Sequence, residues 1–217
     1  MKNTPNKPVG FLIVDDHPFV RRGLKAILAD AYPRAFFGEA ADSSRALQEF
    51  ELVEWDLVLL DINMPGRGGL DVLEDMLRIR PKTRVLVISM YPEEEFALRA
   101  FRLGAAGYLN KSQAGDELVV AVKDILAGRK HVTPALAQTL ATALTDKTPR
   151  APHEALSPRE LQVLCLIAGA NTVKQIAAAL SLSEKTVGTY RTRIAQKTGI
   201  ASNVELTRYA FQHGLTR

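Results

Sequence analysis

Five residues of complementary chemistry each follow a short apolar run in this 217-residue sequence. Asp15 and Asp16 close the run VGFLIVDD, and Asp61 closes DLVLLD. Ser89 lies near the end of RVLVISM, and Lys111 follows GYLN. The set contains three carboxylates, one hydroxyl and one ammonium group, so it combines ligands for a cation with donors for an anion.

The charges of this set indicate phosphate chemistry. Three carboxylates in one pocket would repel one another and raise their pKa values unless a cation neutralised them. A hard divalent cation with oxygen ligands suits this role, and Mg²⁺ is the natural choice where phosphate is involved. Lys111 would then supply a point charge for a phosphate oxygen, and Ser89 a hydroxyl donor. A carboxylate held in this way, such as Asp61, could attack phosphorus and become an aspartyl phosphate.

The elements that must position these residues follow from the apolar pattern. We predict strands at 9–16, 35–40, 56–61, 84–90 and 107–111, because each is a short apolar run. Between and after them, apolar residues at helical spacing predict helices at 18–31, 43–53, 69–80, 93–104 and 116–128. Pro81, Gly104 and Gly128 mark the ends of three of these helices.

Five β-α repeats with continuously apolar strands favour an α/β fold in which a parallel sheet is covered on both faces. In such sheets, ligands sit beyond the carboxyl ends of the strands. With the strand order 2-1-3-4-5, the three acids, Ser89 and Lys111 would converge at one edge.

The segments FLIVDDHPFVRRGLKAIL, LVLLDINMPGRGGLDVL, VLVISMY and GAAGYLNK together resemble the receiver domain of two-component response regulators, over residues 9–127. The resemblance implies a five-stranded flavodoxin-like (CheY-like) fold with Asp61 as the phosphoacceptor. It also implies that Asp15 and Asp16 hold Mg²⁺ together with Asp61 and the backbone carbonyl of Asn63. It further implies that Ser89 and Lys111 contact the phosphoryl group and that Tyr108 is an aromatic switch. Pro65 and Gly66 would shape the loop. The sequence departs from the family at Ser112, where proline is common.

Simpler interpretations exist for single residues. A strand-end Asp such as Asp61 is commonly a helix cap or turn former, but the complete set of five argues against this. Tyr108, as an aromatic residue in a strand, could belong to the core. His17 could be a metal ligand, but we expect a solvated loop histidine, because Mg²⁺ prefers oxygen.

Charge is unevenly distributed along the chain: the N-terminal part is acidic and the C-terminal part is basic. Residues 1–127 contain 16 Lys and Arg against 19 Asp and Glu, whereas residues 151–217 contain 8 against 4. We predict an exposed linker at 128–155, with a possible helix from Pro134 to about Leu144, because TDKTPRAPHEA is polar and has no apolar period. A basic rear half hints at nucleic acid.

Residues 156–217 have four helical segments with explicit start signals. Capping boxes are predicted at residues 157–160, 172–175 and 202–205, and Ser183 precedes another helix. The second and third helices are joined by residues 181–183, which is helix-turn-helix spacing. On the third helix, one face is core-like and the other is polar and basic. That second face suits phosphates and base edges in a major groove, and it carries Lys185, Thr189, Thr192, Arg193 and Gln196.

The segment from Leu156 to Leu206 resembles the LuxR-type helix-turn-helix domain. The resemblance implies that residues 184–197 form the recognition helix and that Lys185, Gly188, Thr189 and Thr192 make groove contacts. Gly188 stands where a larger side chain is common, and Asn203 replaces a frequent arginine. The glycine should weaken the helix by about 1 kcal/mol relative to Ala.

The two resemblances together indicate a response regulator of the NarL/FixJ class. We expect a phosphorylation-controlled transcriptional regulator whose Asp61 accepts a phosphoryl group from a sensor histidine kinase or a phosphotransfer protein. The expected partners also include double-stranded DNA, RNA polymerase and a second copy of the chain in an active homodimer. Because transfer to Asp61 is self-modification, we do not expect an enzyme with sustained turnover.

Two alternatives remain open. An aspartyl phosphatase of the haloacid dehalogenase type also places Asp after a parallel strand, but its second Asp would fall at Asn63, which cannot act as an acid. The other alternative is a DNA binder that is independent of phosphorylation and carries a relic receiver.

No apolar run approaches the ~20 residues of a membrane span. The single Cys165 is expected in the core. Since the first ten residues also lack a secretory signal, we expect no membrane partner and a cytoplasmic location.

Overall fold

The computed structural model describes residues 8–64, 67–91, 93–112, 114–134, 136–138 and 151–215. The chain forms two compact units, Met1–Met90 with Ala100–Val132 and Tyr91–Arg99 with Thr133–Arg217, and each is described by itself. The predicted loop residues Pro65 and Gly66 lie outside the described residues, as do residues 135 and 139–150 of the predicted linker at 128–155. In the predicted helix from Pro134 to Leu144, Pro134 and residues 136–138 are helical, and the remainder lies outside the described residues.

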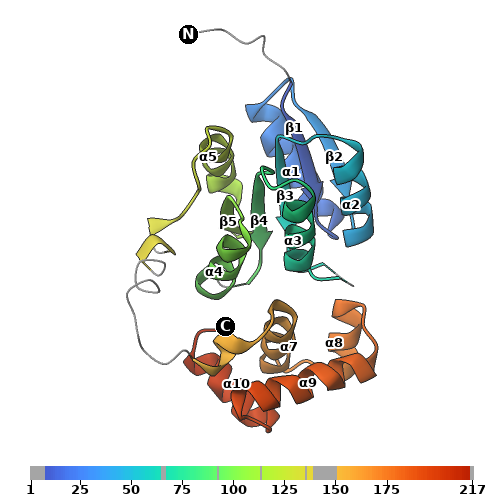
Figure 1. Cartoon of the computed structure of the whole chain (residues 1–217), viewed down its shortest axis with the longest axis vertical. Helices are drawn as coiled ribbons and strands as arrows, with labels where there is room; N and C mark the ends of the chain where they lie inside the picture. Colours follow the sequence, from blue (N-terminus) through green and yellow to red (C-terminus); the bar gives the residue numbers. More distant parts are fainter. Residues whose placement is uncertain are drawn as a thin grey trace. The chain divides into compact units, whose positions relative to one another are not determined.

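The first unit contains a five-stranded parallel sheet (Figure 1). Its strands are β1 (Gly10–Val14), β2 (Phe36–Ala40), β3 (Leu57–Asp61), β4 (Val85–Ser89) and β5 (Gly107–Asn110). The order is β2-β1-β3-β4-β5, and every neighbouring pair is parallel. The predicted fold class and strand order are therefore confirmed.

Five helices connect or follow these strands. They are α1 (Pro18–Ala31), α2 (Ser43–Leu52), α3 (Gly69–Ile79), α4 (Glu93–Leu103) and α5 (Ala114–Leu126). The helix predicted at 116–128 thus begins two residues earlier than expected. After α5 the chain returns to the sheet, where His131 forms an isolated parallel bridge with Gly107 of β5.

Strand residues alternate between two buried faces because successive side chains in a strand point to opposite sides. On one face, a core cluster joins β1, β3, β4 and β5 to residues of α1 and α5, among them Leu24, Leu28, Leu118 and Val122. Helices α2 and α3 contact each other and cover the other face (Figure 1). Because both faces of β1, β3 and β4 are buried, these strands deliver polar side chains to solvent at their ends.

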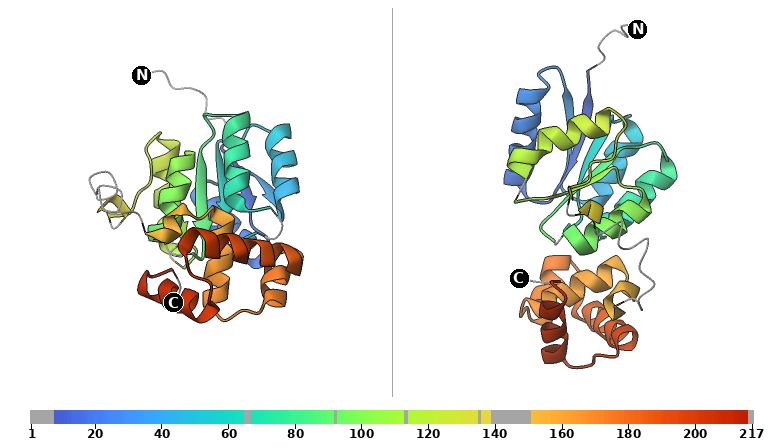
Figure 2. Two further views of the ribbon diagram at one scale, coloured as in Figure 1. Left: turned by 60° about the horizontal axis from the view of Figure 1, so that its bottom comes forward. Right: turned by 90° about the vertical axis from the view of Figure 1, so that its left-hand side faces the viewer.

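The second unit contains four α-helices after the short 3₁₀-helix η1 (Pro152–Ala155). They are α7 (Pro158–Ala168), α8 (Val173–Leu180), α9 (Glu184–Thr198) and α10 (Asn203–Gln212), and α7 packs against α9 and α10 (Figure 2). The core is formed by buried residues of all four helices, including Leu164, Ile176, Val187, Ile194 and Leu206. Cys165 is buried in this core, as predicted.

The predicted helix starts are confirmed in part. Ser157 and Thr172 each form a complete capping box, and the Ser183 side chain accepts a hydrogen bond from the Thr186 backbone. The third predicted box is wrong, because Ser202 is the N-cap of α10 but its side chain makes no cap hydrogen bond. Ser181 ends α8 in the left-handed region at φ 50°, which makes the turn before α9 tight.

Among the described residues, none of the helices combines the length and apolar character that crossing a membrane would require.

Candidate functional site

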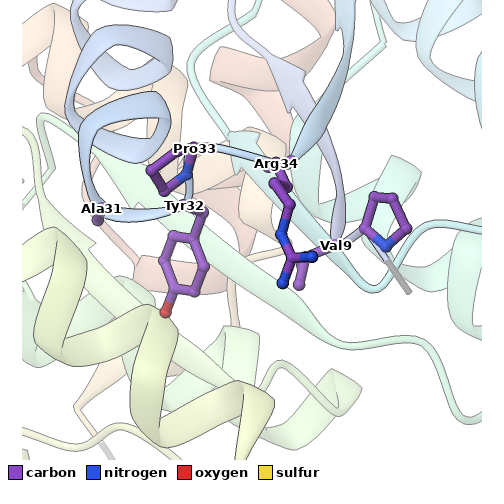
Figure 3. Close-up of a pocket in the computed structure, with 7 residues that line it drawn as sticks. Val9, Ala31, Tyr32, Pro33 and Arg34 are labelled. Atoms are coloured by element: carbon purple, nitrogen blue, oxygen red, sulfur yellow. The ribbon is translucent and has the colours of Figure 1, made fainter. Parts of the chain in front are cut away.

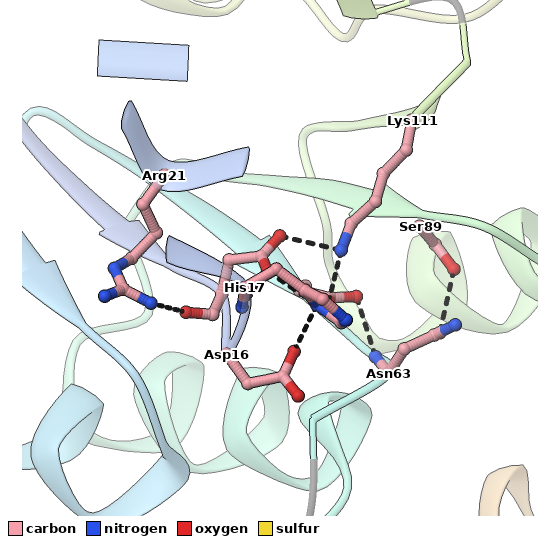
Figure 4. A network of polar contacts seen from close by, with 8 residues as sticks. Asp16, His17, Arg21, Asn63, Ser89 and Lys111 are labelled. Atoms are coloured by element: carbon pink, nitrogen blue, oxygen red, sulfur yellow. Dashed lines mark hydrogen bonds and ion pairs between the residues drawn. The ribbon is translucent and has the colours of Figure 1, made fainter. Parts of the chain in front are cut away.

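The carboxyl ends of β1, β3 and β5 bring the predicted charged residues into contact (Figure 4). The Lys111 ammonium group lies 2.6 Å from Oδ2 of Asp61 and 2.7 Å from Oδ2 of Asp15. These residues are far apart in the sequence but share the sheet edge at which the strands end. The predicted convergence of the acids and the lysine is therefore present.

The other carboxylate oxygen of each buried acid is held by the backbone. Oδ1 of Asp15 accepts a hydrogen bond from the backbone N–H of His17 at 2.8 Å. Oδ1 of Asp61 accepts one from the backbone N–H of Asn63, also at 2.8 Å. Both acids thus form the side-chain-to-backbone turn that Asp favours, which fixes each carboxylate as its strand ends. In each case Oδ2 is left to face the pocket and Lys111.

Burial gives Asp61 unusual electrostatics. Its side chain is buried, and this burial raises the pKa of Asp61 to about 6, although Lys111 opposes the increase. Burial alone would lower the pKa of Lys111, but Asp61 and Asp15 outweigh that effect and raise it. The pocket therefore holds a carboxylate, Asp61, whose charge is costly even beside Lys111, and divalent metal binding relieves such a cost.

The donor set fits a hard divalent cation. One ligand atom from each of Asp15, Asp16, Asp61 and His17 lies within 4.8 Å of the others. Three of these four are carboxylates, which Mg²⁺ prefers. His17 is 62% exposed, consistent with a loop histidine, yet its Nδ1 lies 2.7 Å from Oδ1 of Asp16 and 3.3 Å from Oδ1 of Asp15.

Ser89 and Tyr108 come from β4 and β5. The Ser89 hydroxyl donates to Oδ1 of Asn63 at 3.1 Å, so it reaches the loop that follows Asp61 (Figure 4). Tyr108 is fully buried in this conformation. A switching role for Tyr108 would therefore require a second position of the ring, outside the core.

The sequence reasoning missed one residue at this site, Arg21. Its Nη1 donates to the backbone carbonyl of Asp15 at 2.6 Å (Figure 4). Arg21 lies in the first turns of α1, the helix that begins directly after the acids. A cationic side chain in the first turns of a helix faces the turn that precedes the helix. This position in the sequence is the signal that could have identified Arg21.

A second pocket lies at the opposite ends of the strands and has a volume of about 180 Å³ (Figure 3). It is lined by Pro8, Val9, Ala31, Tyr32, Pro33, Arg34 and Ala35. Arg34 is the one charged residue of this lining, and burial raises the pKa of the Tyr32 phenol. The pocket therefore lacks the paired groups that catalysis or metal binding would need.

In the second unit, α9 has the two faces that the sequence predicted. Val187 and Ile194 are buried against the other helices. The opposite face is exposed, and it carries Lys185, Gly188, Thr189, Thr192, Arg193 and Gln196. Near the end of α9, Lys197 pairs with the buried Glu160 of α7 at 2.6 Å, which anchors the helix while leaving that face open.

The helix carries its exposed side chains in defined orientations. The hydroxyls of Thr189 and Thr192 donate to the carbonyls of Lys185 and Gly188, each at 3.1 Å. Arg191 donates from Nε to Oδ1 of Asn203 at 2.8 Å. Thus Asn203, which stands where arginine is frequent, orients a neighbouring cation of α9.

Comparison with known families matches both units. Residues 11–123 match the response regulator receiver domain, and residues 154–210 match the luxR family of bacterial regulatory proteins. Over 204 residues the chain is 38% identical to the response regulator GacA of Pseudomonas protegens, covering 94% of this chain and 96% of GacA.

Solved structures agree with this comparison. A two-component response regulator of the LuxR family from Aurantimonas sp. SI85-9A1 is 34% identical with a TM-score of 0.59, and the match covers 64% of this chain and 100% of that one. A structure of two RcsB dimers bound to two parallel DNAs is 25% identical with a TM-score of 0.58, and that match covers 94% of this chain and 98% of RcsB.

Proposed function

Because the chain belongs to the two-component response regulators that join a receiver domain to a luxR-type DNA-binding domain, we propose that phosphorylation of Asp61 controls its binding to DNA. In this proposal residues 9–127 are the phosphoacceptor domain, residues 128–155 are the linker, and residues 156–217 bind DNA. The observation that carries the proposal is the Lys111 ammonium group held between Asp15 and Asp61 at the end of the sheet.

The proposed reaction is transfer of a phosphoryl group to one carboxylate oxygen of Asp61. That oxygen attacks phosphorus, and the bond from phosphorus to the donor's histidine nitrogen, or to the oxygen of acetyl phosphate, breaks. Lys111 then pairs with a phosphoryl oxygen, and the Ser89 hydroxyl donates to another. This step modifies the chain itself, so it involves no sustained turnover of a substrate.

The proposed cofactor is Mg²⁺, held by Asp15, Asp16 and Asp61 with the backbone carbonyl of Asn63. When bound, it would supply positive charge against the phosphoryl oxygens. The donor chemistry supports this assignment, because carboxylate oxygens of Asp15, Asp16 and Asp61 lie close together and two of these acids, Asp15 and Asp61, are buried.

The proposed DNA-binding surface is the exposed face of α9. Lys185 and Arg193 would contact phosphates, while Thr189, Thr192 and Gln196 would reach base edges. Gly188 leaves space on this face for close approach of the duplex, since nothing lies within 4 Å of where its Cβ would be. The charge balance of residues 151–217, with 8 Lys and Arg against 4 Asp and Glu, supports an anionic ligand.

The proposed partners follow from these two activities. A sensor histidine kinase or a phosphotransfer protein would donate the phosphoryl group, and RNA polymerase would respond to the bound regulator. We propose a homodimer on paired half-sites as the active form, because one helix-turn-helix reads only a short site. The structure of RcsB dimers on DNA supports this. We propose a cytoplasmic location, because the proposed function requires access to chromosomal DNA.

Phosphorylation would act through Ser89 and Tyr108 in this proposal. Ser89 would turn from Asn63 towards the phosphoryl group, and the Tyr108 ring would exchange between its buried position and one outside the core. A tenfold change in DNA affinity needs only about 1.4 kcal/mol of differential stabilisation. A modest rearrangement of side chains is therefore sufficient for control.

The test is labelling with acetyl phosphate in the presence and absence of Mg²⁺. Asp61→Asn should abolish the Mg²⁺-dependent label, and Asp30→Asn, an exposed acid near the end of α1, should retain it as the matched control. Undiminished labelling of Asp61→Asn would refute the assignment of the acceptor. Sustained hydrolysis of a phosphate monoester would instead favour an aspartyl phosphatase.

Control of DNA binding needs a separate measurement. Genome-wide mapping of bound DNA with the wild-type chain and with Asp61→Asn should show weaker occupancy for the variant at shared sites. Equal occupancy would favour a DNA binder that is independent of phosphorylation.

A further inference from the structure

Arg21 is placed to act on the acidic pocket without entering it. Its Nη1 donates to the backbone carbonyl of Asp15 at 2.6 Å, and its side chain is only 16% exposed (Figure 4). The residue belongs to α1, whereas Asp15 belongs to the turn between β1 and α1. The hydrogen bond therefore ties this turn to the helix that follows it.

Besides the side-chain contacts of Lys111 and His17, three hydrogen bonds hold Asp15. Its N–H donates to the carbonyl of Ala40 in β2 at 3.1 Å, and its Oδ1 accepts from the N–H of His17. In the third hydrogen bond, its carbonyl accepts from Arg21. The first contact belongs to the edge of the sheet and the second to the turn itself. Arg21 thus provides the side-chain contact that sets the direction of the peptide between Asp15 and Asp16.

Arg21 is in turn oriented by an acid on β2. Its Nε lies 3.5 Å from Oε2 of Glu39, and the Lys25 ammonium lies 2.8 Å from Oε1 of the same carboxylate. A hydrogen bond from Lys25 is the main cause that lowers the pKa of Glu39, so this acid stays charged near neutral pH. The guanidinium group is therefore held between a fixed carboxylate and the turn of the pocket.

We propose that Arg21 is a positioning residue for the divalent cation. Its hydrogen bond to the Asp15 carbonyl holds the carboxylates of Asp15 and Asp16 in the arrangement that binds Mg²⁺. This inference rests on the proposed function of the acidic pocket. Residues that orient metal ligands without touching the metal typically change its affinity by about 10- to 100-fold when they are replaced.

Simple electrostatics predicts the opposite sign. A guanidinium group near a divalent cation repels it, so removal of the Arg21 charge should tighten Mg²⁺ binding if charge alone mattered. Loss of positioning should weaken it. The direction of the change therefore separates the two roles in one measurement.

The experiment is calorimetric titration of the metal-free full chain with Mg²⁺. Arg21→Gln should weaken binding about tenfold. Arg21→Lys should weaken Mg²⁺ binding less, because Lys keeps the charge and can still donate a hydrogen bond. It lacks the planar guanidinium group that contacts Glu39 and Asp15 together. Arg22→Gln is the matched control, since Arg22 is the exposed neighbour on the same helix and should bind as the wild type does. Unchanged or tighter binding by Arg21→Gln would overturn the proposal.

A second pair of variants tests the link to Glu39. Glu39→Gln should weaken Mg²⁺ binding in the wild type but add little in the Arg21→Gln background, because the acid acts through the guanidinium group. Fully additive losses of Mg²⁺ affinity would mean that Glu39 acts through its own charge and not through Arg21. That result would contradict the proposed link between Glu39 and Arg21. Should Arg21→Gln fail to fold by circular dichroism, Arg21→Lys carries the test, and wild-type affinity in that variant would overturn the proposal.

Labelling distinguishes this inference from the proposed function itself. Arg21→Gln should reach the wild-type level of acetyl phosphate labelling when the Mg²⁺ concentration is raised about tenfold, to match its weaker affinity. A failure of labelling that more Mg²⁺ does not restore would overturn the positioning role while leaving Asp61 as the acceptor. Absence of both Mg²⁺ binding and labelling in the wild type would instead remove the proposed function, and this inference with it.

Discussion

Asp61→Asn should stabilise the metal-free protein at neutral pH, although it removes the proposed acceptor. Burial raises the pKa of Asp61 to about 6 in the folded chain, against an ordinary value of 3.8. The folded state therefore binds this proton more tightly than the unfolded state does. The stability that Asp61 contributes is fully present below pH 3.8 and is lost as the pH rises to about 6.

The magnitude follows from that difference in pKa. At about 1.4 kcal/mol per pKa unit, the ionised carboxylate costs the metal-free fold about 3 kcal/mol above pH 6. This value already contains the attraction of Lys111 and the repulsion of Asp15. Asn has nearly the same shape as a protonated Asp and never ionises, so the variant avoids the loss. Lys111 retains Asp15 as a partner at 2.7 Å.

The assay is urea denaturation in a chelator at several pH values between 4 and 7.5. Fluorescence of Trp55 reports the receiver unit, because it is the single tryptophan and packs beside Phe36 of β2. The unfolding free energy of Asp61→Asn should exceed that of the wild type by up to about 3 kcal/mol at pH 7. The difference should shrink towards zero near pH 4.

A second signature comes from Mg²⁺. The wild type should gain about 2.7 kcal/mol at a Mg²⁺ concentration 100 times its Kd. Asp61→Asn should gain less, because it has lost a ligand. A variant that is less stable than the wild type at pH 7 without metal, or a difference that does not vary with pH, would refute the assigned cost of the buried charge.

Four further substitutions test the lysine of the acidic pocket, a helix cap and the proposed recognition helix. Lys111→Gln should slow acetyl phosphate labelling yet tighten Mg²⁺ binding in calorimetry, because it removes a cation that pairs with two of the acids; weaker binding would contradict this. Ser157→Ala should destabilise the second unit by about 1 kcal/mol in thermal unfolding, because the side chain accepts the Glu160 backbone hydrogen bond. Lys185→Ala should reduce the salt slope of DNA binding by about 1, whereas Thr189→Ala should alter sequence preference more than the slope in competition gel shifts; no effect of either would mean that the recognition helix is misplaced.

The sequence alone determined the fold class and the place of the acids. Continuous apolar runs of strand length, such as residues 57–60, favour strands buried on both faces, and the helical periods between them favour crossover connections. Parallel strands place the residues at their carboxyl ends at one edge of the sheet, so the sequence alone groups Asp15, Asp61 and Lys111. Helix starts with reciprocal caps, as at Ser157, were equally local and equally predictable.

Tertiary structure determined the contacts between side chains that belong to different elements. Lys111 pairs with both Asp15 and Asp61 because the strands that precede these residues end at the same level of the sheet. No local sequence pattern encodes this alignment of the strands. Arg21 of α1 contacts both the Asp15 carbonyl and Glu39 of β2, and this combination depends on how α1 packs beside the sheet. The missing cap hydrogen bond at Ser202 is a further example, since the local sequence allows this bond but the side chain does not make it. Sequence patterns report burial and period, whereas distances between side chains follow from how the elements pack.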